Sequence, residues 1–115
     1  MIRLQRAAFL YKCLGHEVRL RILHALIYHQ QRNVYVLDLA KMLNIPRTNV
    51  VKHLRFLRKN GIVTRHHDYY NGKAYYKITK EEETFSILIH SIDSWRENSP
   101  ELLADSRAFA EGQYG

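Results

Sequence analysis

Apolar residues in the first thirty positions recur at the three- and four-residue spacing of amphipathic helices. The first such stretch runs from Leu4 to Leu14 and ends at Gly15, a helix breaker. A second helix is expected from about His16 to His29. The apolar stripes consist of Leu4, Ala7, Ala8, Tyr11 and Leu14 in the first segment and of Val18, Ile22, Leu23 and Leu26 in the second.

The next segment has the pattern of two short helices joined by a tight turn. After a polar break, Val34 to Val36 is β-prone and short enough to form a single edge strand, and Leu37 to Leu43 predicts a two-turn helix. Pro46 suits the first position of a further helix, where its missing N–H has no cost. That helix is expected over about Arg47 to Asn60, before Gly61. Two helices with such a turn are the helix-turn-helix signature.

Helical geometry divides this second helix into two faces. At about 100° per residue, Val50, Leu54 and Leu57 fall together and must face the core. The opposite, exposed side is cationic and polar, and it consists of Thr48, Lys52, Arg55 and Lys59. Arg47 projects from the first turn and Asn49 from the flank, where the end of the helix can approach a groove.

A β-hairpin is predicted directly after the helix-turn-helix. Ile62 to Tyr70 and Lys73 to Thr79 are rich in β-branched and aromatic residues, and Asn71-Gly72 between them is a strong signal for a two-residue turn. Such a turn would place residue 70 opposite residue 73. A cationic hairpin in this position is a wing.

A long amphipathic helix is expected near the C-terminus. Thr79 followed by Glu82 resembles a capping box, and the helix should run to about Asn98. Its apolar stripe consists of Phe85, Leu88, Ile89, Ile92 and Trp95. Ser99-Pro100 then begins a last short helix through Ala110. The predicted fold is mainly α with a small β-hairpin wing: a winged helix-turn-helix domain with dimerisation helices over 1–98, followed by a short helix and tail over 99–115.

Charge is distributed unevenly along the chain. Residues 41–80 hold ten Lys or Arg against one Asp, whereas residues 81–115 hold two against eight Asp or Glu. A basic centre is typical of a protein that binds a polyanion, because phosphates neutralised by Lys and Arg release condensed counterions. An ordinary solvated basic face is the alternative that charge alone leaves open.

Length and cysteine content limit the other possibilities. With 115 residues, the chain has material for one core. The single Cys13 cannot close an intramolecular disulfide, the N-terminus lacks the pattern of a signal peptide, and no apolar run approaches the length of a membrane span. We therefore expect a cytoplasmic protein.

Three passages in the right order and spacing resemble the ArsR (arsenic-repressor-type) family of winged-helix regulators. They are LGHEVRLRILHAL at 14–26, DLAKMLNIPRTNVVKHLRFLRKNGIV at 38–63 and NGKAYYKI at 71–78. The resemblance implies a homodimer, paired through its first and last helices, that binds a pseudo-palindromic operator in double-stranded DNA. It also implies that bases are read from the first turns of the helix after Pro46.

Carried over by position, the resemblance selects the DNA-reading residues Arg47, Thr48, Asn49, Val51 and Lys52. The face division adds Arg55. Arg can pair with guanine, Asn with adenine, and Thr or Val can contact a thymine methyl group. The alternative for Thr48 and Asn49 is that they satisfy backbone groups near the helix start. Arg65, His67 and Lys73 in the wing are expected to hold phosphates or the minor groove.

The two apolar stripes at the ends of the chain are more apolar than a lone domain of this size should expose, so we expect them to meet across a two-fold axis. The predicted interface consists of Leu4, Ala8, Tyr11, Phe85, Leu88, Ile89, Ile92 and Trp95.

A metal site is not predicted. Many members of the family bind a metal through a cysteine pair, but the equivalent stretch here, Val34 to Asp38, contains no Cys. His90 and Asp93 partly match another family site and, in a dimer, two such pairs would give Zn²⁺ four ligands. The alternative is that His90 and Asp93 form a surface pair on the polar side of the helix. Cys13 is interpreted as a buried small hydrophobe. No cofactor is expected, and the effector, whether a small molecule or a metal, is not identified.

Two other classes of function compete with DNA binding. A winged-helix module whose main partner is protein or RNA is the alternative, although such a docking helix would more often carry apolar residues in place of Arg47 to Lys52. An enzyme is not expected, because the sequence has no glycine-rich phosphate loop, nucleophile elbow or HExxH motif.

Overall fold

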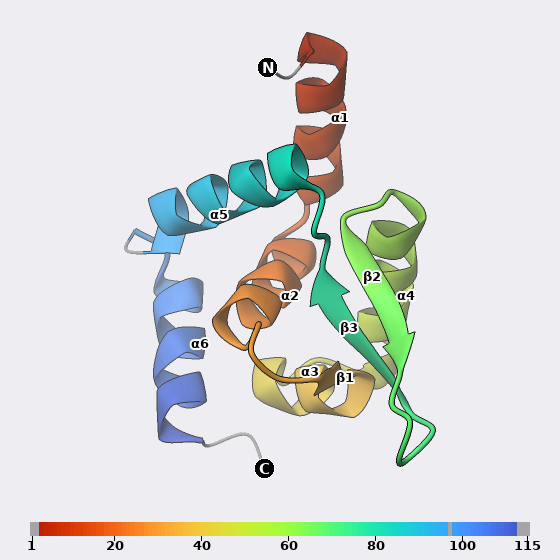
Figure 1. Cartoon of the computed structure of the whole chain (residues 1–115). Helices are drawn as coiled ribbons and strands as arrows, with labels where there is room; N and C mark the ends of the chain where they lie inside the picture. Colours follow the sequence, from red (N-terminus) through yellow and green to blue (C-terminus); the bar gives the residue numbers. More distant parts are fainter. Residues whose placement is uncertain (1–2, 97, 113–115) are drawn as a thin grey trace.

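A computed structural model describes residues 3–96 and 98–112 of the chain (Figure 1). Helices and strands follow the order α1–α2–β1–α3–α4–β2–β3–α5–α6. Their bounds are Leu4–Leu14 for α1, Glu17–Tyr28 for α2, Val34–Tyr35 for β1, Val36–Leu43 for α3, Arg47–Lys59 for α4, Val63–His67 for β2, Ala74–Ile78 for β3, Glu82–Arg96 for α5 and Pro100–Glu111 for α6. The mainly α class with a small wing is confirmed.

Helix α2 is the centre of the core. It packs against each of the other five helices, and all its residues from Ile22 to Ile27 are buried. A helix that is buried on every side needs apolar residues all round, which explains why its pattern is broader than a single stripe. The helix begins after His16, whose Nδ1 accepts a hydrogen bond from the amide of Val18 at 3.1 Å.

The helix-turn-helix is closed by local hydrogen bonds. At the start of α3 the Asp38 carboxylate accepts the amide of Tyr35 at 3.1 Å. Asn44 follows α3 with a left-handed φ of 54°, a conformation that Asn tolerates better than most residues. After the turn, the carbonyl of Pro46 accepts the amide of Val50, at 3.2 Å, in the first turn of α4. Gly61, at φ 75°, follows the end of α4 as predicted.

The sheet has the strand order β1–β3–β2, all antiparallel. The predicted edge strand is confirmed, and Val34 pairs with Tyr76. In the hairpin, His67 pairs with Ala74, so β2 ends before the predicted boundary. The two-residue turn at Asn71-Gly72 is wrong, because the six residues 68–73 separate the strands.

The wider loop has a physical cause in one aspartate. The carboxylate of Asp68 accepts the amides of Tyr70 at 2.8 Å and Asn71 at 3.2 Å. Its carbonyl accepts the amide of Gly72 at 2.9 Å, and Gly72 adopts a φ of 70°. An Asp side chain that captures backbone donors two and three residues ahead favours a local turn over continuation of the strand.

Helix α5 is capped differently from the prediction. The Glu81 carboxylate, rather than Thr79, accepts the amides of Glu83 and Thr84 at 3.2 and 2.9 Å. Hydrogen bonds from Thr84, followed by the bond from the Glu83 amide, hold the pKa of Glu81 below its usual range. Thr79 instead accepts the amide of Glu81 itself at 3.2 Å. The capping position is therefore two residues later than the pattern indicated.

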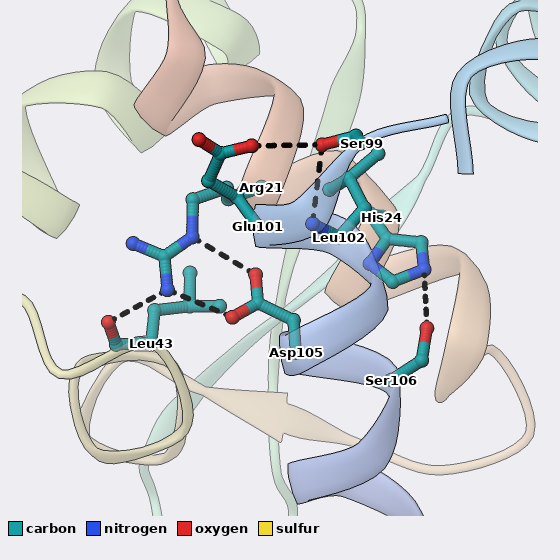
Figure 2. Close-up of polar contacts among 8 residues, drawn as sticks. All are labelled: Arg21, His24, Leu43, Ser99, Glu101, Leu102, Asp105 and Ser106. Atoms are coloured by element: carbon teal, nitrogen blue, oxygen red, sulfur yellow. Dashed lines mark hydrogen bonds and ion pairs between the residues drawn. The ribbon is translucent and has the colours of Figure 1, made fainter. Parts of the chain in front are cut away.

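Helix α6 is fixed to α2 and to the end of α3 (Figure 2). The Arg21 guanidinium donates to both oxygens of Asp105, from Nε at 2.9 Å and Nη2 at 2.8 Å. The same Nη2 donates to the carbonyl of Leu43 at 3.0 Å. Ser99 caps α6 by accepting the amide of Leu102 at 3.2 Å. The segment that the sequence analysis separated, residues 99–115, therefore contains a helix, α6, that packs against α2 and α3.

Candidate nucleic-acid interface

The exposed side of α4 has the composition that the sequence predicted. Its core face is confirmed, since Val50, Leu54 and Leu57 are buried. The polar residues of the first three turns point outward, and they are Arg47, Thr48, Asn49, Lys52 and Arg55. Val51 is half-buried between the two faces. The first turns of α4 therefore present polar and cationic groups to solvent.

A groove of about 580 Å³ separates α4 from the wing. Arg47, Val51, Arg55 and Arg58 line it from α4, while Arg65, Lys73, Ala74 and Tyr76 line it from the hairpin and Tyr35, Val36 and Leu37 from the start of the helix-turn-helix. The lining residues include four arginines and one lysine but no Asp or Glu. Such a surface attracts a polyanion, because its five cations outnumber the two carboxylates bonded to Tyr35, those of Asp38 and Asp68.

The structure brings most of the predicted DNA contacts together, but not all. A second hollow on α4, of about 360 Å³, is lined by Arg47, Thr48, Val51, Lys52 and Arg55. Asn49 and His67 are exposed but line neither hollow. Arg58 was missed by the sequence reasoning, although its spacing of three residues from Arg55 places it on an adjoining part of the helix surface.

The wing is fastened to the helix-turn-helix through Asp68. The Tyr35 hydroxyl donates to its carboxylate at 2.6 Å, and Asn33 Nδ2 donates at 3.4 Å. This hydroxyl, together with the amides of Tyr70 and Asn71, holds the pKa of Asp68 below its usual range. The one acidic residue of segment 41–80 is therefore engaged by donors of the protein itself.

Aromatic contacts fix α4 against α2. The rings of His16 and His53 lie 4.3 Å apart, and the guanidinium of Arg19 lies 4.1 Å from the centre of the Phe56 ring. Burial and the neighbouring positive charges lower the pKa of His53. The sequence pattern did not identify this contact, because its two histidines lie 37 residues apart in the chain.

The predicted dimer residues differ in how much of their surface is left exposed. On α1, Leu4 and Tyr11 are 88% and 57% exposed, and Ala8 is exposed. On α5, Phe85, Ile89 and Trp95 are half-buried and pack against the edge of the core. Leu88 and Ile92, at 0% exposure, are fully buried in the chain's own core. Their assignment to a dimer contact is therefore corrected, because no surface of theirs remains for a partner.

The weak metal candidates do not form a cluster in the described part of the chain. His90 and Asp93 are exposed on α5, where Asp93 pairs with Arg96 at 3.2 Å. Among residues 3–96 and 98–112, no three His, Cys, Asp or Glu side chains gather closely enough to hold a metal ion. Cys13 is buried, as expected, and burial raises the pKa of its thiol.

No helix within the described ranges combines the length and the apolar character needed to cross a membrane.

Comparison with known proteins supports the fold and the family. A helix-turn-helix domain family matches residues 14–66. A cadmium resistance transcriptional regulatory protein of Listeria innocua, CadC, is 31% identical over 78 residues, which is 68% of this chain and 61% of that protein. The chain thus spans about three-fifths of the length of this curated relative.

Solved structures give the same result. The transcriptional regulator HlyU of Vibrio vulnificus is 30% identical, with a TM-score of 0.62 over 76% of this chain and 88% of that one. The transcriptional repressor BigR of Xylella fastidiosa has a TM-score of 0.64 at 22% identity, over 83% of this chain and 84% of that one. With the helix-turn-helix, the three-stranded sheet and the wing in place, the chain belongs to the ArsR-type family of winged helix-turn-helix regulators.

Proposed function

We propose that the chain is a transcription regulator that binds double-stranded DNA sequence-specifically, as a homodimer on a pseudo-palindromic operator. The observation that carries the proposal is the groove between α4 and the wing, with its four arginines and one lysine and no carboxylate in its lining. A major groove about 12 Å wide accepts an α-helix, and phosphates on either side of it would meet the cations that flank α4.

Base reading is assigned to the first turns of α4. Arg47 and Asn49 are exposed there, and their side chains pair with guanine and adenine, respectively, through two hydrogen bonds. Thr48, Val51 and Lys52 line or adjoin the same end of the helix. An apolar docking surface, as a protein partner would require, is not what this end of α4 presents.

Phosphate binding is assigned to the hairpin wall of the groove and to the later part of α4. Arg65 and Lys73 extend from the hairpin, and Arg58 extends from the later part of α4. Contacts from these residues would fix the register of the protein on the duplex without reading its sequence. His67, exposed near the end of β2, extends the same surface toward the wing tip.

Selection of bound duplexes from a random pool tests the proposal directly. We expect a palindrome-like sequence to be enriched, and Arg47→Ala or Asn49→Ala to lose about 1 to 3 kcal/mol on that sequence and little on scrambled DNA. Recovery of no preferred duplex, together with tight binding of RNA or protein, would contradict the proposal.

A salt titration separates the readers from the phosphate contacts. Arg65→Ala or Lys73→Ala should weaken operator and scrambled duplex alike, and should lower the salt slope by about one for each phosphate that is no longer neutralised, or about two when both wings of a dimer bind. Arg107→Ala is the matched control, because it removes one exposed arginine from α6, away from the groove (Figure 1). If the wing variants change base preference while Arg47→Ala weakens all sequences, the two roles are reversed.

The homodimer is proposed to form through α1 and the edge of α5. Leu4 and Tyr11 leave apolar surface in solvent on α1, and Phe85, Ile89 and Trp95 lie half-buried along α5. Apolar side chains left partly or fully in solvent on such helices are typical of a surface that a second copy covers.

Sedimentation at micromolar concentration tests the assembly. The wild-type chain should be a dimer, and Tyr11→Glu should dissociate it, because the change places a charge in the interface without disturbing a buried site. Leu103→Glu on α6, at a residue that is 38% exposed, is the matched control and should remain dimeric. A monomeric wild-type chain would refute the dimer and the palindromic operator together.

A further inference from the structure

The tip of the wing carries two tyrosines that the groove does not use. Tyr69 and Tyr70 are 93% and 95% exposed, and their rings meet edge to face with centroids 5.6 Å apart. They lie in the loop between β2 and β3, which projects beyond the rest of the molecule (Figure 1). Burial of a tyrosine side chain removes a large apolar area from water, so two adjacent rings left in solvent mark a surface with a partner.

The loop presents these rings from a fixed base. Asp68 and Lys73 close it through an amide-to-carbonyl hydrogen bond of 2.8 Å. The Asp68 carboxylate holds the amide of Tyr70, and Asn71 Nδ2 donates to the Tyr35 hydroxyl at 3.4 Å. Because the backbone on both sides of the rings is tied to β1, less ordering entropy is lost when the tip binds.

The chemistry around the rings favours nucleic acid over protein as the partner. From residue 62 to residue 80, Asp68 is the one acidic residue, and it is saturated by donors of the loop and of Tyr35. Strand β2 carries Arg65, His66 and His67 before the loop, and Lys73 is the last residue of the loop. An apolar protein surface would be complementary to apolar neighbours, whereas these neighbours are cationic or polar.

We propose that Tyr69 and Tyr70 form an aromatic wedge that enters the minor groove of the DNA and bends the duplex at the edge of the operator. The inference rests on the proposed function, since the same duplex must occupy the groove beside α4. Aromatic and apolar wedges open base steps from the minor groove and kink DNA toward the major groove. The tyrosine hydroxyls would additionally find acceptors on the minor-groove edges of A·T pairs.

This wedge would give the regulator specificity at positions that α4 does not touch. Pyrimidine–purine steps unstack and kink more easily than others, so a sequence with such a step under each wing tip would bind more tightly. The preference would appear as enriched flanking positions without a base-pairing side chain.

The experiment compares the wild-type chain with Y69A/Y70A and Y69F/Y70F on the selected duplex. Dyes at the two duplex ends report bending by energy transfer, and 2-aminopurine placed at the flanking step reports unstacking by a rise in fluorescence. We expect both signals with the wild type and with the phenylalanine variant, and neither with the alanine variant. Affinity should fall about tenfold for the alanine variant, with the salt slope unchanged because tyrosine neutralises no phosphate.

Each result has a single interpretation. Equal bending and equal 2-aminopurine fluorescence for the alanine variant and the wild type would overturn the wedge while leaving DNA binding intact. A changed oligomeric state with unchanged DNA binding would assign the rings to a second copy, and would also overturn it. If the wild-type chain selects no duplex at all, the proposed function fails first. Because both side chains are almost fully exposed, circular dichroism should show folded protein for every variant.

Discussion

Replacing Asp105 by alanine should be among the more destabilising single changes to a charged residue of this chain. The carboxylate binds Arg21 through two hydrogen bonds of 2.8 and 2.9 Å, and the side chains of Arg21 and Asp105 are 25% and 7% exposed (Figure 2). Asp105→Ala would leave the guanidinium with the Leu43 carbonyl as its remaining acceptor in this cluster. The loss is therefore that of a largely buried pair with one partner removed.

Two known limits give the magnitude. Removal of one partner of a buried pair costs about 3 to 5 kcal/mol, whereas an exposed pair contributes about 0 to 1 kcal/mol. Because Arg21 keeps a quarter of its side-chain surface in solvent, it can rehydrate in part, and we expect about 2 to 3 kcal/mol. At about 4 °C per kcal/mol for a chain of this length, Tm should fall by about 8 to 12 °C.

Urea and thermal unfolding followed by circular dichroism at one fixed protein concentration measure the effect, since association shifts Tm. Asp93→Ala is the matched control, because Asp93 is 55% exposed in a pair with Arg96 at 3.2 Å, and it should cost less than about 0.5 kcal/mol. Hydrogen exchange at Ile45 should also speed up in Asp105→Ala, since Arg21 holds the end of α3 before the turn. Equal losses for Asp105→Ala and Asp93→Ala would refute the reasoning.

Three further predictions use the same assays. Burial, assisted by the charge of Arg96, lowers the pKa of His24 to about 4. Because the unfolded chain takes up this proton below about pH 6.5 and the folded chain does not, the free energy of unfolding should fall by about 3 kcal/mol from pH 6.5 to pH 4. His24→Gln should flatten this fall, and identical pH profiles for the variant and the wild type would contradict the prediction. Leu88→Ala should lower the free energy of unfolding by about 2 to 5 kcal/mol, as expected of a core residue, whereas Leu103→Ala on the exposed surface of α6 should lower it far less. A small loss for Leu88→Ala would indicate that Leu88 belongs to the dimer interface and not to the core. Arg58→Ala should lower the salt slope of DNA binding by about one, and an unchanged slope would remove Arg58 from the phosphate contacts.

Local patterns in the sequence predicted the helices and the helix-turn-helix because their causes are local. The α1 bounds match the periodic stretch from Leu4 to Leu14, and Gly61 ended α4 where expected. The prediction for the wing loop was wrong because Asp68 captures the amides of Tyr70 and Asn71, and because a tertiary contact holds its carboxylate in place. The side chain of Asp68 is held by Tyr35, 33 residues earlier in the chain, and the Asn71-Gly72 pattern contains no trace of that contact.

The apolar stripe of α5 shows a second limit of sequence patterns. Helical spacing groups Leu88 and Ile92 with Phe85, Ile89 and Trp95, but the structure buries the first two in the core and leaves the others at its edge. A stripe reports only that a face is apolar, and one wide face can meet both the chain's own core and a partner. The Arg21–Asp105 pair, 84 residues apart, likewise had no signal in local sequence.

The acidic C-terminal third and the basic centre of the chain can be understood as one arrangement. Asp105 is paired with Arg21, Glu81 caps α5, and Glu101 accepts the Ser99 hydroxyl at 3.1 Å. Helix α6 lies on the side of the molecule away from the wing, and α5 runs from the end of β3 away from the wing tip (Figure 1). At physiological salt, charges more than about 8 Å apart are largely screened, so these carboxylates do not weaken the field of the groove. At low ionic strength, where the screening length grows to about 30 Å at 0.01 M, the dipolar distribution would orient the protein, with α4 and the wing toward DNA, before contact is made.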